Sequence, residues 1–109
     1  MSAHEFGIME RTPLSGERYD AYEPEKYGCI QVDDALVEKL DWDLQSVDCF
    51  WHTVDKVGKG LAYCGITLIP PASLRSIIAV LDEKRELAAL KRLLEQAERE
   101  DKFVIHFGI

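Results

Sequence analysis

The sequence contains no long uninterrupted apolar run. Its 109 residues hold no stretch close to the roughly 20 apolar residues that a membrane-spanning helix needs. The opening segment, MSAHEFGIMERTPLSGERYD, also lacks the apolar centre of a secretory signal. We therefore expect a protein with no membrane partner and a cytoplasmic location.

Cysteine is scarce and irregularly spaced. The three residues are Cys29, Cys49 and Cys64, an odd number with no CxxC or similar spacing. Each lies among apolar residues, where a thiol behaves as a small and unreactive hydrophobic group. The pattern predicts no cysteine metal site and no thiol catalysis, and it places Cys49 and Cys64 on the buried face of a sheet.

Motifs for cofactors, metals and nucleic acids are missing as well. No GxGxxG follows a predicted strand, and the bare YxxxK at 22–26 contains Pro24, so it cannot lie on one continuous helix. No basic patch offsets the net charge of −7, which repels nucleic acid. His52 and His106 lack the close spacing of metal-ligating histidines. The sequence therefore predicts no cofactor, no metal, no nucleic-acid partner and no enzymatic activity.

The negative charge is concentrated in one part of the chain. Residues 27–55 carry seven acidic side chains against Lys39 alone, which gives −6, whereas residues 56–109 carry nine basic and seven acidic side chains, which gives +2. Such a field steers a basic protein toward the acidic part. Acidity is also common among soluble proteins in general, and the sequence leaves both interpretations open.

The length and the pattern of elements predict a single α+β domain over residues 1–109. Residues 1–26 show no persistent apolar period and are predicted to form an irregular N-terminal arm across the domain. A short amphipathic helix is expected at 34–40, and a helix pair at about 73–81 and 85–100. Strands are expected at 27–32, 47–54, 61–69 and 102–109. Together they predict a mostly antiparallel sheet of about four strands with a two-helix layer on one face.

The stretch from Val47 to Ile69 organises this prediction as a hairpin around the glycine-rich segment DKVGKG. A four-residue loop within that segment pairs Trp51 with Ile66. One face of the hairpin then belongs to the core, and its members are Cys49, Trp51, Ala62, Cys64, Ile66 and Leu68. A shift of one residue would reverse the faces.

The acidic side chains surround a short predicted helix that also carries a tryptophan. The set consists of Asp33, Asp34, Glu38, Asp41, Trp42 and Asp43. An aromatic anchor within an acidic rim is typical of surfaces that bind basic proteins, because the charges speed association and the ring supplies binding energy. The alternative interpretation is a solvated acidic helix whose Trp42 points into the core.

A family resemblance extends this interpretation. The irregular start, the acidic first half, the PPAS helix start and the terminal KFVIHFGI resemble small bacterial immunity proteins of polymorphic and contact-dependent toxin systems, best over residues 60–109. The resemblance implies a non-enzymatic cytoplasmic protein that binds and neutralises one cognate toxin, often a basic nuclease. Such an inhibitor would mimic the phosphate backbone or cover an adjacent surface, with the six residues above as contacts.

Two other functions remain open from the sequence alone. A small-molecule-binding or enzymatic domain would use a sheet face around His52 and His106, made of Phe50, His52, Tyr63, Thr67 and His106. A homodimeric structural or regulatory module would pair its hairpin or its terminal strand across a two-fold axis. The protein is accordingly expected to be a monomer or a homodimer.

Overall fold

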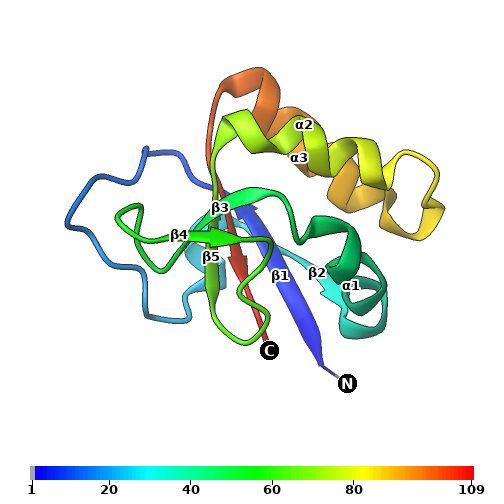
Figure 1. Cartoon of the computed structure of the whole chain (residues 1–109), viewed down its shortest axis with the longest axis horizontal. Helices are drawn as coiled ribbons and strands as arrows, with labels where there is room; N and C mark the ends of the chain where they lie inside the picture. Colours follow the sequence, from blue (N-terminus) through cyan, green and yellow to red (C-terminus); the bar gives the residue numbers. More distant parts are fainter. Residues whose placement is uncertain (1) are drawn as a thin grey trace.

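The computed structural model describes residues 2–109 and shows, within them, one six-stranded antiparallel sheet (Figure 1). The strands are β1 (Ala3–Ile8), β2 (Ile30–Asp33), β3 (Asp48–Trp51), β4 (Val57–Lys59), β5 (Ile66–Ile69) and β6 (Val104–Phe107). Their order across the sheet is β2-β1-β6-β5-β3-β4. The last strand in sequence therefore lies in the middle and joins the two halves of the sheet.

Helices cover one face of this sheet. The α-helices are α1 (Asp34–Asp41), α2 (Pro71–Leu81) and α3 (Ala88–Glu100), and the short 3-10 turns are η1 (Pro24–Tyr27), η2 (Trp42–Leu44) and η3 (Arg85–Leu87). Figure 1 shows α2 and α3 side by side above the sheet, with α1 beside β2. The predicted apolar faces are confirmed, since the buried residues of α2 and α3 include Leu74, Ile77, Ile78, Leu81, Leu90, Leu94 and Ala97.

The opposite face of the sheet is covered by residues 9–29. This segment contributes Met9, Tyr19 and Tyr27 to a second hydrophobic cluster. The sheet side of the cluster consists of Ile66, Leu68, Ile105 and Phe107. Because both faces are covered, β5 and β6 are buried at every position.

The described residues form six strands rather than about four and three α-helices rather than two, whereas the antiparallel α+β architecture of a single domain is confirmed. The prediction of an irregular arm over residues 1–26 is wrong for Ala3–Ile8, which forms β1 between β2 and β6. Gly7 obscures the strand pattern in the sequence, yet its position requires a glycine, because a Cβ would overlap Tyr27 and Cys29. Residues 9–29 do form an arm across the sheet.

The predicted hairpin is replaced by three strands. β3 pairs with β4 along one edge and with β5 along the other, and Trp51 lies opposite Thr67 rather than Ile66. This one-residue difference turns Ile66 toward the arm instead of the helices. β3 ends at Trp51 because His52 has a left-handed backbone, with φ of 64°, which redirects the chain. Cys64, predicted in the core, is exposed in the turn before β5.

The start of α2 also differs from the prediction at Ser73. The helix begins at Pro71, behind Pro70 as its N-cap, and proline suits the first helical position because that amide has no helical partner. The Ser73 hydroxyl donates instead to the backbone carbonyl of Asp48 at 2.5 Å. Ser73 therefore ties α2 to β3.

The position of Trp51 depends on a glycine in the neighbouring strand. Its indole ring lies over Gly58 of β4, where a Cβ would overlap the ring. The indole N–H donates to the carbonyl of Gly60 at 3.0 Å. A side chain at position 58 would therefore displace the ring and break this hydrogen bond.

Gly58→Ala should lower the free energy of unfolding by about 1–3 kcal/mol, the usual cost of overpacking. Urea denaturation followed by tryptophan fluorescence measures the change. Val57→Ala is the matched control, because Val57 is adjacent and 65% exposed, and its effect should stay within about 0.5 kcal/mol. Equal losses in the two variants would contradict the contact described for Gly58.

Candidate functional site

α1 and η2 present a polar surface with one exposed aromatic ring. Val37, Leu40 and Leu44 turn inward and are almost completely buried. Trp42, by contrast, has 78% of its surface exposed. It is the C-cap of α1 and the first residue of η2, so the helix geometry changes at this residue. The interpretation in which Trp42 points into the core is therefore wrong.

The acidic side chains of this region differ in their surroundings. We call Asp33, Asp34, Glu38, Asp41, Trp42 and Asp43 the acidic surface. Asp33, Glu38 and Asp43 are exposed, and Asp41 is half-buried. Asp34 keeps only 26% of its side chain exposed, because its carboxylate accepts hydrogen bonds from inside the molecule. Asp34 is thus the member of the set that connects the surface to the interior.

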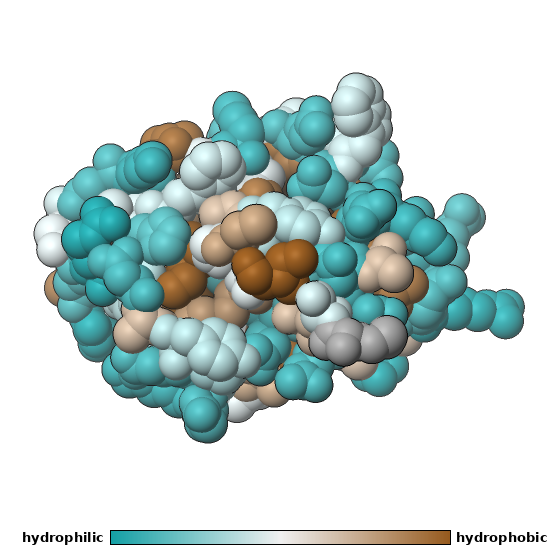
Figure 2. Space-filling model, turned by 90° about the horizontal axis from the view of Figure 1, so that it is seen from below, coloured by the Kyte–Doolittle hydropathy of each residue, from teal (hydrophilic) through white to brown (hydrophobic). Residues whose placement is uncertain are grey.

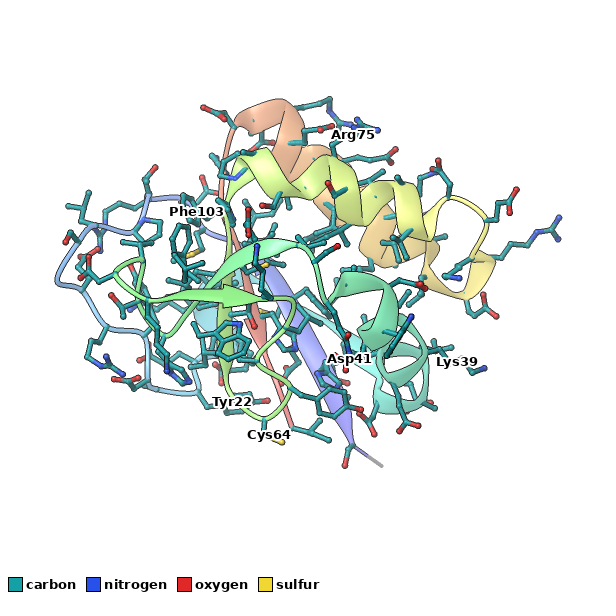
Figure 3. The ribbon with its side chains drawn as sticks, viewed as in Figure 1. Tyr22, Lys39, Asp41, Cys64, Arg75 and Phe103 are labelled. Carbon is teal, nitrogen blue, oxygen red and sulfur yellow. The ribbon has the colours of Figure 1, made fainter. Side chains whose placement is uncertain are left out.

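Three of these carboxylates act together on one tyrosine. Asp34, Glu38 and Asp41 are spaced i, i+4 and i+7, which places them on one side of α1. The Tyr63 hydroxyl donates to Asp34, and that hydrogen bond, followed by burial and by the three negative charges, raises the pKa of Tyr63 well above its ordinary value. Figure 3 shows Lys39 pointing away from Asp41.

A small apolar patch adjoins Tyr63 at the lower end of the molecule. The amide of Ile109 donates to the carbonyl of Tyr63 at 3.1 Å, which places the C-terminal residues against the turn before β5. Ile109 is 43% exposed and Cys64 is also exposed. Figure 2 shows apolar surface at this end, surrounded by hydrophilic side chains. Tyr63 therefore lies between this patch and the carboxylate of Asp34.

A chain of hydrogen bonds runs from Asp34 into the sheet. His4 Nε2 lies 2.9 Å from Asp34 Oδ1, and His4 Nδ1 lies 2.8 Å from His106 Nε2. His106 Nδ1 then lies 3.0 Å from Thr67 Oγ1, which also accepts the Ala62 amide at 2.8 Å. His4, His106 and Thr67 are completely buried. We call Asp34, His4, His106 and Thr67 the histidine relay.

The strand register explains why these side chains meet. Thr67 lies directly opposite His106, and Phe6 lies opposite His106 on the other edge of β6. His4, two residues before Phe6, is therefore diagonal to His106 on the same face. The two imidazole rings stack with their centroids 5.1 Å apart. A buried polar chain of this kind is stable only because each group has a partner.

Burial determines the charge of this chain. Burial, and then the nearby His4, lower the pKa of His106 to about 3, so His106 is neutral at neutral pH. The pKa of Asp34 is lowered too, because Tyr63 and then His4 donate to its carboxylate. The ionised Asp34 carboxylate can only accept, so His4 Nε2–H donates to it. When both rings are neutral, His106 Nε2–H then donates to His4 Nδ1 and the Thr67 hydroxyl donates to His106 Nδ1.

His4 is the member of the relay whose role the sequence indicates least. It lies in the segment that the sequence predicts to be irregular, and only the alternation of His4, Phe6 and Ile8 marks it as part of a strand. The sequence predicts Asp34 as a partner-binding residue, but only as a charge on the surface. Its bond to His4 follows from the pairing of β1 with β2, which brings the Asp34 amide to the Ser2 carbonyl at 3.1 Å.

The predicted ligand-binding face around His52 and His106 is not one surface. His106 and Thr67 are buried on the face of the sheet that the helices cover, whereas Phe50 belongs to the arm-facing cluster. His52 lies beyond the end of β3 and contacts the arm, with Nδ1 2.9 Å from Asp20 Oδ1. The prediction fails because it assigns the wrong register and places His52 inside a strand.

The thiols differ in exposure. Burial raises the pKa of Cys49 to about 12 and the pKa of Cys29 to about 11, so both thiols stay protonated at neutral pH. Cys64 is exposed. The prediction of a buried Cys64 is wrong because residues 61–65 form a turn rather than the beginning of a strand.

Among residues 2–109, no group of three or more histidine, cysteine, aspartate or glutamate side chains is placed to hold a metal ion. In the same described range, every helix is too short or too polar to cross a membrane. No protein-family model, curated protein or solved structure matches the chain. A function therefore has to be inferred from the arrangement of the side chains themselves.

Acidification should destabilise the protein through His106. The folded state keeps His106 neutral down to about pH 3, whereas unfolded histidine accepts a proton near its ordinary pKa of about 6.5. The unfolded state therefore binds more protons between these values, and the free energy of unfolding falls by roughly 1 kcal/mol for each pH unit below about 6.5. This stability is fully present above that pH.

Urea denaturation at a series of pH values measures this slope. His106→Gln should lower this slope by the contribution of about one proton, whatever the substitution does to stability at neutral pH. His52→Asn is the control, because asparagine tolerates the left-handed backbone at this position. A slope unchanged by His106→Gln would contradict the neutral, buried state of His106.

Proposed function

We propose that this protein binds a basic protein partner through the acidic surface. The observation that carries the proposal is the 78% exposure of Trp42 within a rim of carboxylates. Large aromatic side chains are costly to leave in water, and they are enriched among the residues that dominate binding energy at interfaces. The inward sides of α1 and η2 are anchored by Val37, Leu40 and Leu44, so the ring is held on a rigid support.

The charges around Trp42 favour a partner rich in arginine and lysine. Residues 27–55 carry a net charge of −6, and the exposed Asp33, Glu38 and Asp43 can pair with such cations. Carboxylates accept two parallel hydrogen bonds from one arginine, which adds geometric selectivity. Long-range attraction raises the association rate, while the desolvated ring slows dissociation.

The specific form of this proposal is an immunity protein that neutralises a basic bacterial toxin in the cytoplasm. The resemblance of residues 60–109 to such proteins supports it, and so does the acidic character of the surface. The protein acts without catalysis in this proposal. It blocks the toxin by occupying a surface that otherwise receives a nucleic-acid backbone. The burial of His106 and Thr67 supports a binding role over a catalytic one, because a molecule at the surface would not reach a side chain that is completely buried.

The homodimer alternative receives less support. Its terminal-strand form required an open edge on the strand at 102–109. β6 is instead paired with β1 on one side and with β5 on the other. A second copy cannot add to that strand without displacing one of its neighbours.

Trp42→Ala should weaken binding of the partner by about 30-fold or more, which corresponds to a loss of at least about 2 kcal/mol at an interface hot spot. Proteins retained by the immobilised wild-type chain from a lysate of its own cells supply the candidates. Affinity is then measured with each purified basic candidate. The partner should inhibit growth when it is expressed alone and lose that effect when the wild-type chain is co-expressed.

The charge requirement is tested with two double variants of equal net charge. Glu38→Lys with Asp43→Lys reverses charge on the acidic surface, whereas Glu83→Lys with Glu86→Lys does so at exposed positions around η3. The first pair should lower the association rate at low salt by tenfold or more, and the second should change it far less. Equal effects would show that net charge rather than this surface governs binding. A bound partner without toxicity would contradict the immunity role alone.

A further inference from the structure

The histidine relay ends on a carboxylate of the acidic surface. His4 Nε2 and the Tyr63 hydroxyl both reach Oδ1 of Asp34, and 26% of the Asp34 side chain remains exposed. The same carboxylate therefore takes part in a buried hydrogen-bond chain and faces solvent at the surface. A change of protonation inside the sheet reaches the surface through this one group.

The relay holds a fixed number of protons in its neutral state. Only one proton fits between His4 Nδ1 and His106 Nε2, which are 2.8 Å apart. The ionised Asp34 carboxylate accepts from His4 Nε2–H, so His4 Nδ1 accepts from His106 Nε2–H, and the Thr67 hydroxyl, whose oxygen also accepts the Ala62 amide, donates to His106 Nδ1. Each ring then carries one proton, on Nε2, and the chain of donors runs in one direction toward Asp34.

An additional proton from solvent reverses part of this chain. The proton binds His106 at Nδ1, the proton on His106 Nε2 passes to His4 Nδ1, and the Thr67 hydroxyl turns from donor to acceptor. His4 then carries both ring protons and the positive charge, next to the Asp34 carboxylate. No electron is transferred and no covalent bond other than N–H bonds is made or broken.

The charged groups around the relay favour this location of the positive charge. Asp34 contacts His4 directly, and Glu38 and Asp41 of α1 act on Tyr63, whose ring lies edge-on to His4 with centroids 4.8 Å apart. Thr67 of β5 and the Ala62 amide contribute only dipoles. His106 resists the charge, because it is completely buried and adjacent to the other ring.

We propose that uptake of one proton by the paired His4 and His106 converts Asp34 from a surface charge into half of an internal ion pair, and so makes binding at the acidic surface weaker at acidic pH. This inference rests on the proposed function, because it concerns the regulation of the same surface. Unperturbed imidazole changes its protonation between about pH 5 and pH 8, and the inference is tested over that range.

The first measurement follows the free protein by NMR from about pH 8 to about pH 5. The ring ¹⁵N shifts report the protonation of His4 and His106, and the side-chain ¹³C shift reports the Asp34 carboxylate. At the upper pH we expect both imidazole rings to carry their proton on Nε2. As the pH falls, we expect the shifts of His4 and Asp34 to change together. Protonation of His4 without any response of Asp34 would overturn the inference.

The second measurement uses a hexa-arginine peptide as the cationic probe, because arginine keeps its charge throughout this range. Its dissociation constant is measured from the fluorescence of Trp42, with Trp51→Phe as the background so that Trp42 is the sole tryptophan. Affinity should fall about three- to tenfold between the two pH values, as expected for one charge lost at a solvated contact.

His4→Gln is the informative variant, since the amide can still donate to Asp34 but cannot accept a proton at neutral pH. It should bind the peptide normally at about pH 8 and lose the pH dependence, whereas His52→Asn should keep it. A pH dependence that survives His4→Gln would overturn the inference alone. A peptide that leaves Trp42 fluorescence unchanged at both pH values would contradict the proposed function as well. If His4→Gln does not fold, the NMR titration of the wild-type chain decides the matter.

Discussion

The rest of the structure depends on the complete burial of β6. This strand is paired along both edges and covered on both faces, with Val104 and His106 toward the helices and Ile105 and Phe107 toward the arm. Backbone groups in such a strand find partners only in its two neighbours, because water does not reach them. β6 therefore aligns β1 with β5 and joins two hydrophobic clusters into one domain.

A histidine within this strand constrains residues that are distant in sequence. A buried imidazole needs partners for both nitrogens, and His106 obtains them from Thr67 and His4. His4 in turn holds the first turn of α1 through Asp34. The orientation of the helix that carries Trp42 is thus linked to polar contacts at the centre of the sheet. The interior and the proposed binding surface share one hydrogen-bond network.

The elements with strong local patterns could be predicted from the sequence. The 3.6-residue period of leucines and isoleucines is enough to predict α2 and α3. The alternation around His106 is enough to predict which side chains of β6 share a face of the sheet. α1 starts at Asp34, in agreement with the amphipathic helix predicted at 34–40. β1 could not be predicted in this way, because Gly7 and the charge of Glu5 conceal its alternation and its stability comes from pairing on both sides. The register of β3 differs from the predicted one because the left-handed His52 ends that strand early.

The sequence by itself determined the helices, the acidic character of residues 27–55 and the presence of an aromatic residue among those acids. These properties follow from composition and from short-range periodicity. Only the tertiary structure decided that Trp42 faces solvent, that Asp34 turns inward, and that His4 meets His106 across 102 positions of chain. Such contacts depend on strand order and register, which arise when distant segments bury their apolar faces together and which no local pattern encodes.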